Sequence, residues 1–223
     1  MPELVCVPTL PSWISQDQPL YLNATICARV RKQFSGLQKS GKPGIFLNIP
    51  YSRRYSNLEI AIISTVTAYD LTPRMARERS RTEARLLKIA ELMLTCQYGL
   101  TDLSYVKRMN MPLELGLLLA FGKESFIMSG KRYGALRTIS DLNFSDIHYH
   151  EGGVRRLIVG LSRWIEQTRP TKRLTTLTLL RRYRRCRQIR ESLDDDFDRL
   201  TPDEISGMLG IAREEFQMRL RET

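Results

Sequence analysis

The chain has 223 residues, 42% of them hydrophobic, and a formal net charge of +11. That hydrophobic fraction is enough to build a core, which excludes a globally disordered protein. The N-terminus reads MPELVCVPTLPSW, without the positive start and apolar run of a secretory signal, and no apolar stretch approaches the ~20 residues that cross a bilayer. The four cysteines are scattered and form no CxxC pair. We therefore expect a cytoplasmic protein with no membrane segment and no metal site.

The chain divides into three parts. The run Ser40–Gly44 (SGKPG) is rich in residues that break regular structure and predicts a boundary. We expect an N-terminal arm over 1–43 with a helix over 23–37, an α/β domain over 44–170, and a C-terminal helical extension over 171–223.

Five short segments of the central part have the pattern of strands. Buried strands are short apolar runs that end at proline, glycine or a polar residue. In chain order we predict them at 44–50, around 70–74, at 98–102, at 125–129 and near Ile147.

Four helices alternate with these strands. Ser56 and Glu59 predict a capping box that begins the first helix, and Ser80 and Glu83 predict a second. The third helix lies between Pro112 and Gly122, and because it is apolar on nearly every side we expect it to be buried. A closing helix is predicted over 154–168. This alternation predicts a Rossmann-like or flavodoxin-like parallel sheet with helices on both faces.

In such sheets, ligands bind beyond the carboxyl ends of the strands. Glu114 is the sole acid of its apolar helix, and we expect it in the first turn, where the helix dipole favours a carboxylate. A carboxylate there can attack or stabilise an electron-poor sugar C1′, as cleavage of an N-glycosidic bond requires. The other candidates at strand ends are Asn48, Tyr51, Arg53, Arg54, Arg74, Asp102, Ser104 and Asn110.

Each candidate also has an ordinary structural interpretation, and spacing alone favours it. Glu114 could merely complement the helix dipole, and Asp102 could cap a turn or helix. The two arginines after the first strand could be solvated surface charges, and Tyr51 could simply pack its ring.

Four motifs together resemble the nucleoside 2-deoxyribosyltransferase-like proteins in order and spacing: Ile45–Tyr51 (IFLNIPY), Gly99–Ser104 (GLTDLS), Asn110–Gly116 (NMPLELG) and Ala120–Lys123 (AFGK). They also resemble a bacterial branch of that superfamily, related in architecture to TIR domains, whose members are often effectors of antiviral defence. The resemblance covers 44 to about 168.

The resemblance implies a role for several residues. Glu114 matches the family's nucleophile, Tyr51 matches the tyrosine that positions it, and Asp102 matches an acid that lines the nucleoside pocket. Asn48 and Ser104 are implied to line the same pocket. The transferase relatives are oligomers and no cofactor is implied, so we expect a homo-oligomer that needs none.

The sequence departs from the family just before the nucleophile. The transferases usually carry a further acid there, which contacts the base, whereas this chain has the basic stretch Lys107–Asn110. Together with Arg53 and Arg54, that stretch suits a phosphorylated ligand such as a nucleotide or NAD. We therefore predict an N-glycosidase acting on such a ligand. A non-catalytic nucleotide-sensing or interaction module with the same fold is the alternative.

Two further features stay outside this prediction. His148 and His150 are an i, i+2 pair, for which we expect a loop or structural role rather than metal binding. The segment 171–190 has eight basic residues and no acid, and 191–204 then reverses the sign. We predict a basic helix whose apolar residues share one face and whose arginines lie in solvent. This apolar stripe packs on the domain or on a partner subunit and consists of Leu174, Leu177, Leu180 and Tyr183. Binding of nucleic acid or a companion defence protein through the arginines is the third alternative.

Overall fold

The computed structural model describes residues 43–50, 52–76, 85–105, 110–130 and 147–193. The helix predicted over 23–37 and the capping box of Ser80 and Glu83 lie outside these ranges. The described strands form one five-stranded parallel sheet in the order β2-β1-β3-β4-β5. This is the flavodoxin-like strand order, and it confirms the predicted fold class.

The strands lie where the sequence predicts them. Their bounds are β1 Gly44–Asn48, β2 Thr72–Arg74, β3 Tyr98–Asp102, β4 Glu124–Ser129 and β5 Ile147–Tyr149. The chain passes from β1 to β2 on one side and then returns to place β3, β4 and β5 on the other. The order therefore reverses between β1 and β3, where Asn48 is level with Thr101. Ligand sites of open α/β sheets lie at this reversal.

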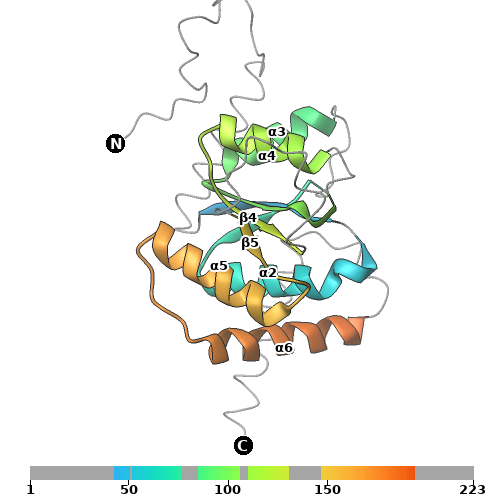
Figure 1. Ribbon diagram of the computed structural model, residues 1–223, viewed down its shortest axis with the longest axis vertical. Coiled ribbons are helices and arrows are strands. Elements are labelled where there is room, and N and C mark those ends of the chain that lie inside the picture. Colours follow the sequence, from blue (N-terminus) through green and yellow to red (C-terminus); the bar gives the residue numbers. More distant parts are fainter. Residues whose placement is uncertain (1–42, 51, 77–84, 106–109, 131–146, 194–223) are drawn as a thin grey trace, which may run out of the picture.

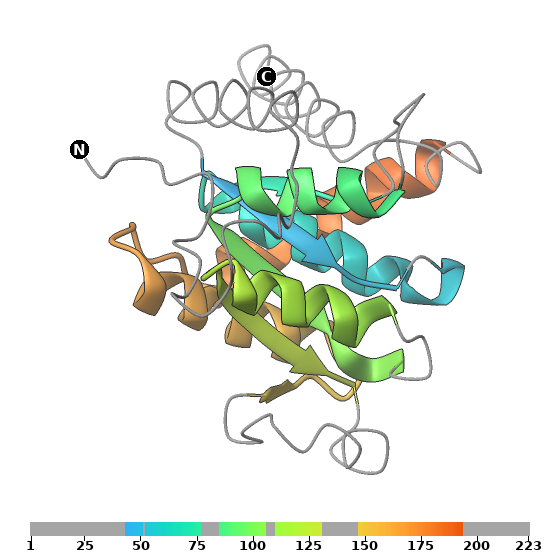
Figure 2. The ribbon, with the colours of Figure 1, turned by 90° about the horizontal axis from the view of Figure 1, so that it is seen from above.

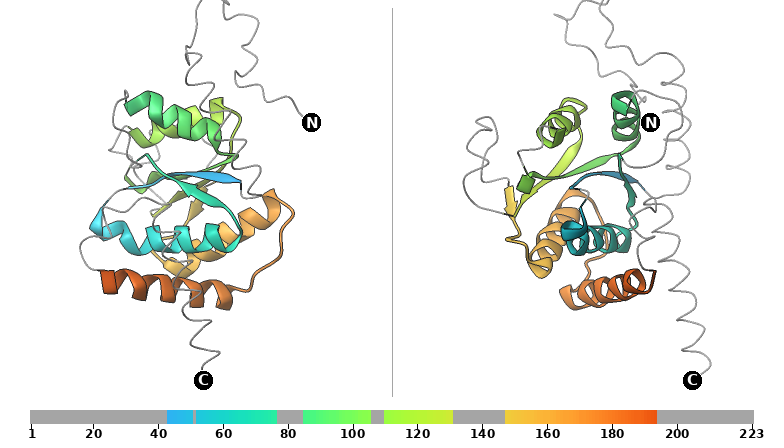
Figure 3. Two further views of the ribbon diagram at one scale, coloured as in Figure 1. Left: turned by 180° about the vertical axis from the view of Figure 1, so that it is seen from behind. Right: turned by 90° about the vertical axis from the view of Figure 1, so that its right-hand side faces the viewer.

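Helices cover both faces of the sheet in unequal depth (Figure 1). Helices α3 (Arg85–Thr95) and α4 (Asn110–Ala120) lie on one face, and α2 (Ser56–Ala68) and α5 (Val154–Thr168) lie on the other. Helix α6 (Thr176–Leu193) forms a further layer outside α2 and α5, as the end-on view of Figure 3 shows. Seen from above, α4 and α3 run along the strands (Figure 2).

Helix α6 packs on the domain through most of the predicted stripe: Tyr183 is buried in the core, and Leu174 and Leu180 are partly buried against it. Leu179, Tyr183 and Cys186 are buried and belong to the same core as α2. Their i, i+4, i+7 spacing puts them on one face of the helix. Leu177 was expected in the stripe, yet it is 56% exposed, because it lies on the opposite side of α6 from the buried Cys186. The prediction that the arginines of α6 lie in solvent is confirmed for the exposed Arg181, Arg184 and Arg187. The other three, at 182, 185 and 190, are half-buried, and Arg182 donates a hydrogen bond to Thr67 Oγ1 of α2 at 3.1 Å.

The prediction that the apolar helix α4 is buried on nearly every side is wrong. Met111, Leu115 and Leu118 are buried against the sheet, whereas Leu113 is 58% and Leu119 47% exposed. In the described part of the chain no further layer lies outside α4, so one face of this helix remains at the surface.

The first helix begins at Ser56 as predicted, but the capping box does not form. Tyr55 occupies the N-cap position in a helical conformation, with φ −88° and ψ −10°, and the helix has no side-chain cap hydrogen bond. The reason is the preceding 3-10 turn η1 (Arg53–Tyr55), which runs directly into α2 and leaves Ser56 inside the helix.

Candidate functional site

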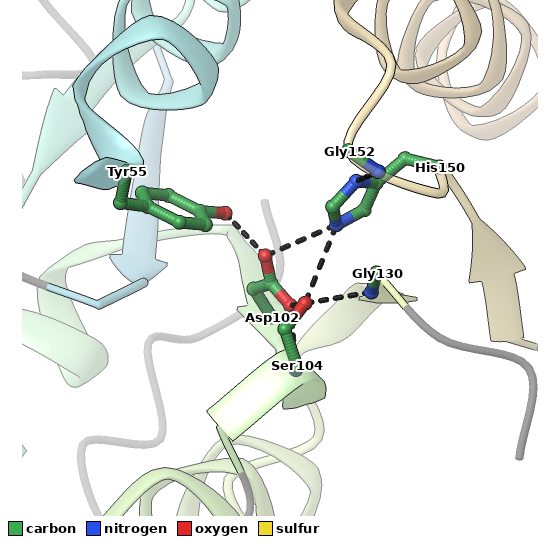
Figure 4. A network of polar contacts seen from close by, with 6 residues as sticks. All are labelled: Tyr55, Asp102, Ser104, Gly130, His150 and Gly152. Carbon is green, nitrogen blue, oxygen red and sulfur yellow. Dashed lines mark hydrogen bonds and ion pairs between the residues drawn. The ribbon is translucent and has the colours of Figure 1, made fainter.

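A buried carboxylate at the end of β3 gathers polar groups from three segments. Asp102 is fully buried. Its Oδ2 accepts a hydrogen bond from the Tyr55 hydroxyl and lies 3.3 Å from Nε2 of His150. Its Oδ1 accepts hydrogen bonds from the Ser104 hydroxyl and, at 2.7 Å, from the Ser104 backbone N–H. Figure 4 shows these side chains converging from the segments that follow β1, β3 and β5. Both carboxylate oxygens are therefore engaged.

Ser104 is held on both sides of its hydroxyl. The backbone N–H of Gly130, just after β4, donates to Ser104 Oγ at 2.6 Å, while that hydroxyl donates to Asp102. A Cβ at Gly130 would lie 3.0 Å from Ser104 Oγ and 3.3 Å from Cε1 of His150. Glycine at 130 thus lets β4 approach the network closely.

The imidazole of His150 has a defined orientation. The backbone N–H of Gly152 donates to Nδ1 at 3.0 Å, so Nδ1 is an acceptor and the ring proton of the neutral form is assigned to Nε2. That proton faces Asp102 Oδ2, with Ser104 Oγ 3.4 Å from the same nitrogen. The tight turn that makes this possible has positive φ at Glu151 (51°) and Gly152 (73°).

These residue types suggest a serine hydrolase, but the geometry excludes a Ser-His-Asp triad. In a triad the serine and the acid contact opposite ring nitrogens, so that the imidazole can take the serine proton. Here Ser104 and Asp102 both face Nε2 of His150, and the serine hydroxyl donates to the carboxylate. The network instead connects the segments that follow β1, β3, β4 and β5 at the carboxyl edge of the sheet.

Asn48 connects this edge to the start of α4. It is buried at the last position of β1, and its Nδ2 donates to the carbonyl of Met111 at 2.8 Å. Thr101 Oγ1, on the neighbouring strand β3, is 3.4 Å from the same nitrogen. The N-terminal turn of α4 is therefore fixed at the reversal between β1 and β3, and Asn48 positions backbone rather than lining a pocket through a free amide.

Glu114 is half-buried on α4, but it is not in the first turn as predicted. The helix begins at Asn110, two residues before Pro112, so Glu114 is its fifth residue. The dipole contribution falls off beyond the first turn, which weakens that part of the expectation. Glu114 nonetheless follows Met111 by only three residues, and Met111 is hydrogen-bonded to Asn48 at the strand reversal.

The other predicted residues that the structure describes lie at or near the same edge of the sheet. Arg54 is exposed in η1, Arg74 ends β2, and Asn110 is exposed at the first position of α4. Arg53 lies in η1. Tyr51, Lys107 and Arg108 lie outside the described residues. Asp102 and Ser104 are brought into contact, and Asp102 also serves as the turn cap that was its ordinary interpretation, through the Ser104 N–H.

Two members of the network were missed by sequence reasoning. Tyr55 contacts Asp102 from η1, four residues beyond the tyrosine that the family motif indicated. His150 follows β5 and is buried, which agrees with the loop or structural role expected for it, but its contact with Asp102 was not predicted. A signal existed for His150, because it follows a predicted strand and precedes the Gly152-Gly153 pair that enters α5. No comparable local signal marks Tyr55.

The described residues contain no cluster of three or more His, Cys, Asp or Glu side chains that could hold a metal ion. In the part of the chain that the structure describes, no helix combines the length and apolar character needed to cross a membrane.

Comparison with known proteins adds no assignment. A scan against models of protein families, a search of curated proteins and a search of solved structures each found no match to this chain.

Proposed function

We propose that the carboxyl edge of the sheet binds a nucleotide-like ligand and that the protein cleaves its N-glycosidic bond. The observation that carries the proposal is the Asn48–Met111 hydrogen bond of 2.8 Å. It fixes the helix that bears Glu114 at the strand-order reversal, beside the buried Asp102 network. The motifs that resemble the nucleoside 2-deoxyribosyltransferase-like proteins occupy these same segments and support the proposal.

The roles that we assign to the two acids rest on the hydrogen bonds of Asp102 and on the motif that contains Glu114. Both oxygens of Asp102 are engaged by Tyr55, Ser104 and His150. We therefore assign Asp102 a positioning role, in which it holds these three side chains in place. Glu114 matches the family's nucleophile in the motif that resembles the nucleoside 2-deoxyribosyltransferase-like proteins, so we assign it the role of the carboxylate that supports the reaction. It stabilises the positive charge that develops at C1′, or bonds to C1′, as the base leaves with the bonding electron pair. Water adds its hydroxyl to C1′ and its proton goes to the base; where Glu114 had bonded to C1′, that bond breaks and the carboxylate is regenerated. Alternatively, a second base takes the place of water and accepts the sugar.

A phosphate on the ligand would suit this edge. The N-termini of α2, α4 and α5 follow the carboxyl ends of β1, β3 and β5, so their free backbone N–H groups and positive dipole ends lie on one side of the sheet. Arg54 is exposed in η1 at the same side and supplies a guanidinium. A nucleoside phosphate or an NAD-like dinucleotide is therefore the substrate class that we propose.

A nucleotide-binding module without turnover is the second candidate. The saturation of Asp102 favours it, because a carboxylate with every acceptor position filled serves binding and rigidity better than proton transfer. The two candidates share the site and differ in the fate of the glycosidic bond.

The proposal is tested by incubating the purified protein with nucleosides, nucleoside monophosphates and NAD and measuring the free base by chromatography. The matched variants are Glu114→Gln and Glu124→Gln; Glu124 is exposed at the start of β4, on the other edge of the sheet. We expect base release by the parent and by Glu124→Gln, with a loss of about 100-fold or more in Glu114→Gln. Equal release by Glu114→Gln and the parent would contradict the assignment. Binding without release by any of the three would favour the second candidate.

A further inference from the structure

The outer face of α6 carries a row of arginines for which the proposed reaction has no use. Helix α6 buries Leu179, Tyr183 and Cys186 against the domain. On a helix of 3.6 residues per turn, the side opposite these residues holds Leu177, Arg181, Arg184 and Gln188, and all four are exposed. We call Arg181, Arg184 and the flanking, half-buried Arg185 the arginine face.

The segment that carries this face is strongly basic. Residues 171–193 contain eight basic residues and one acid, Glu191, although Arg182 is turned inward and donates to Thr67 Oγ1 of α2 at 3.1 Å. That acid is engaged by Arg187, with 2.8 Å between Nε and Oε1, at the side of the helix. Lys172 and Arg173, just before the helix, are also exposed. The charge is therefore not balanced by carboxylates within this stretch of the chain.

We propose that the arginine face of α6 binds the phosphate backbone of a nucleic acid, without reading its bases. Guanidinium groups form two parallel hydrogen bonds with a phosphate and are less strongly hydrated than ammonium groups. A helix of 18 residues is about 27 Å long, the length of roughly eight base-pair steps. Among the described residues, helix α6 is also the outermost layer on its side of the sheet, as Figures 1 and 3 show, so a polyanion can lie along it.

The composition of the same face argues against the other polyanionic partners. Specific protein partners need buried apolar or aromatic anchors, and the exposed side of α6 offers one large apolar residue, Leu177. A helix that lies in a membrane surface uses its apolar face to enter the bilayer, whereas α6 buries that face inside the protein. The exposed face also carries no aromatic ring on which a base could stack, so the binding is to phosphates.

The test is fluorescence anisotropy of the full chain with labelled 24-base-pair DNA and RNA duplexes of one sequence and of a scrambled sequence. We expect similar affinity for both sequences and a fall of log K with log salt with a slope of about −3, corresponding to roughly three neutralised phosphates. The double variant Arg181→Glu/Arg184→Glu is expected to weaken binding at least 10-fold. Whichever duplex is preferred identifies the source of the phosphates.

The matched control reverses the same number of charges elsewhere, at the exposed Arg155 and Arg163 of α5. Equal weakening by the two double variants would overturn the proposal, because the effect would then come from net charge. No binding by the parent, or tighter binding to vesicles with 30% phosphatidylserine than to either duplex, would also overturn it. Thermal melts establish that each variant is folded. Base release measured on the α6 variant separates this proposal from the previous one, since neither arginine lies at the carboxyl edge of the sheet.

Discussion

Two helices of similar apolar character, α2 and α4, lie on opposite faces of the sheet and differ in how deeply their side chains are buried. Every residue of α2 from Glu59 to Val66 is buried. In α4, Leu113 and Leu119 are 58% and 47% exposed. The difference comes from layering rather than from the helices themselves. Helix α6 covers the outer side of α2, and the described residues place no such cover over α4. An apolar helix is therefore buried only as deeply as the layers around it allow.

The two faces of the sheet also differ in the number of layers that cover them and in the size of their core clusters. The α2 face is three layers deep from sheet to α6 and carries the larger core cluster. The α4 face is thinner, and its helix begins at the strand reversal with Glu114 in its second turn. The deeper face carries more of the core, and the thinner face carries Glu114, to which we assign a role in the proposed reaction.

The largest expected difference between the faces is in the cost of removing an apolar side chain. Ile62 is fully buried in α2, so Ile62→Ala should lower the free energy of unfolding by about 2–5 kcal/mol. Leu119→Ala, on the exposed side of α4, should change it by less than about 0.5 kcal/mol. Urea unfolding of the two variants measures both values. A large loss in Leu119→Ala would mean that the exposed leucines are covered in solution.

Two helical glycines give the next largest contrast. A Cβ at Gly160 of α5 would lie 2.2 Å from Cε1 of His148, whereas a Cβ at Gly116 of α4 meets nothing within 4 Å. Gly160→Ala should therefore destabilise the fold by about 1–3 kcal/mol through overpacking. Gly116→Ala should stabilise it by about 0.5–1 kcal/mol, because alanine favours the helix. Thermal melts of both variants check the signs, and a shared sign would contradict the account.

A smaller effect concerns alkaline pH on the α2 face. Tyr69, just after α2, donates a hydrogen bond of 2.6 Å to Oε1 of Glu166 on α5. Burial and the neighbouring Glu166 raise the pKa of Tyr69 well above its usual value. The stability from this protonated tyrosine is fully present below about pH 10, where the unfolded chain's tyrosine ionises, and is lost as the pH rises further. Unfolding midpoints at pH 8 and 11 should fall more steeply for the parent than for Tyr69→Phe. Parallel slopes would contradict the assignment.

The smallest expected effect is at mildly acidic pH. Burial lowers the pKa of His148, and the nearby His150 and Arg163 lower it further, against the opposing hydrogen bond with the Arg156 carbonyl. A fold that holds a histidine neutral becomes less stable as the pH falls below about 6.5. The unfolded chain then binds a proton that the folded chain excludes. His148→Asn should reduce the difference between urea midpoints at pH 7.5 and 5.5. An unchanged difference would assign the acid sensitivity elsewhere.

The sequence was a good guide to the strands and helices of the domain. The apolar runs of β1 and β3 and the helical spacing of α5 depend on local chemistry, so their positions could be predicted closely. The sequence predicted the parallel sheet but not the order of its strands, because the Rossmann-like and flavodoxin-like classes share the alternation of strands and helices and differ in that order. Depth of burial was harder, because exposure of Leu113 and Leu177 depends on which helix covers which.

The candidate site could be predicted in part. Asp102 and Ser104 follow a strand, and their position at the sheet edge was readable from the chain. The contact of Asp102 with Tyr55 and His150 joins residues 47 and 48 positions away, and such contacts arise only from the tertiary fold. The missing capping box at Ser56 has a related cause, since the η1 turn that carries Tyr55 to Asp102 displaces the helix start.

We propose that a nucleotide binds at the carboxyl edge of the sheet, at the reversal between β1 and β3. A titration of the ¹⁵N-labelled protein with adenosine monophosphate and with NAD, followed by amide chemical shifts, locates the binding site. We expect shifts that concentrate at Ser104, Gly130 and Gly152, with little change at Gly44, Tyr98 and Glu124 on the opposite edge. Shifts centred on that opposite edge or on α6, or none with either ligand, would contradict it.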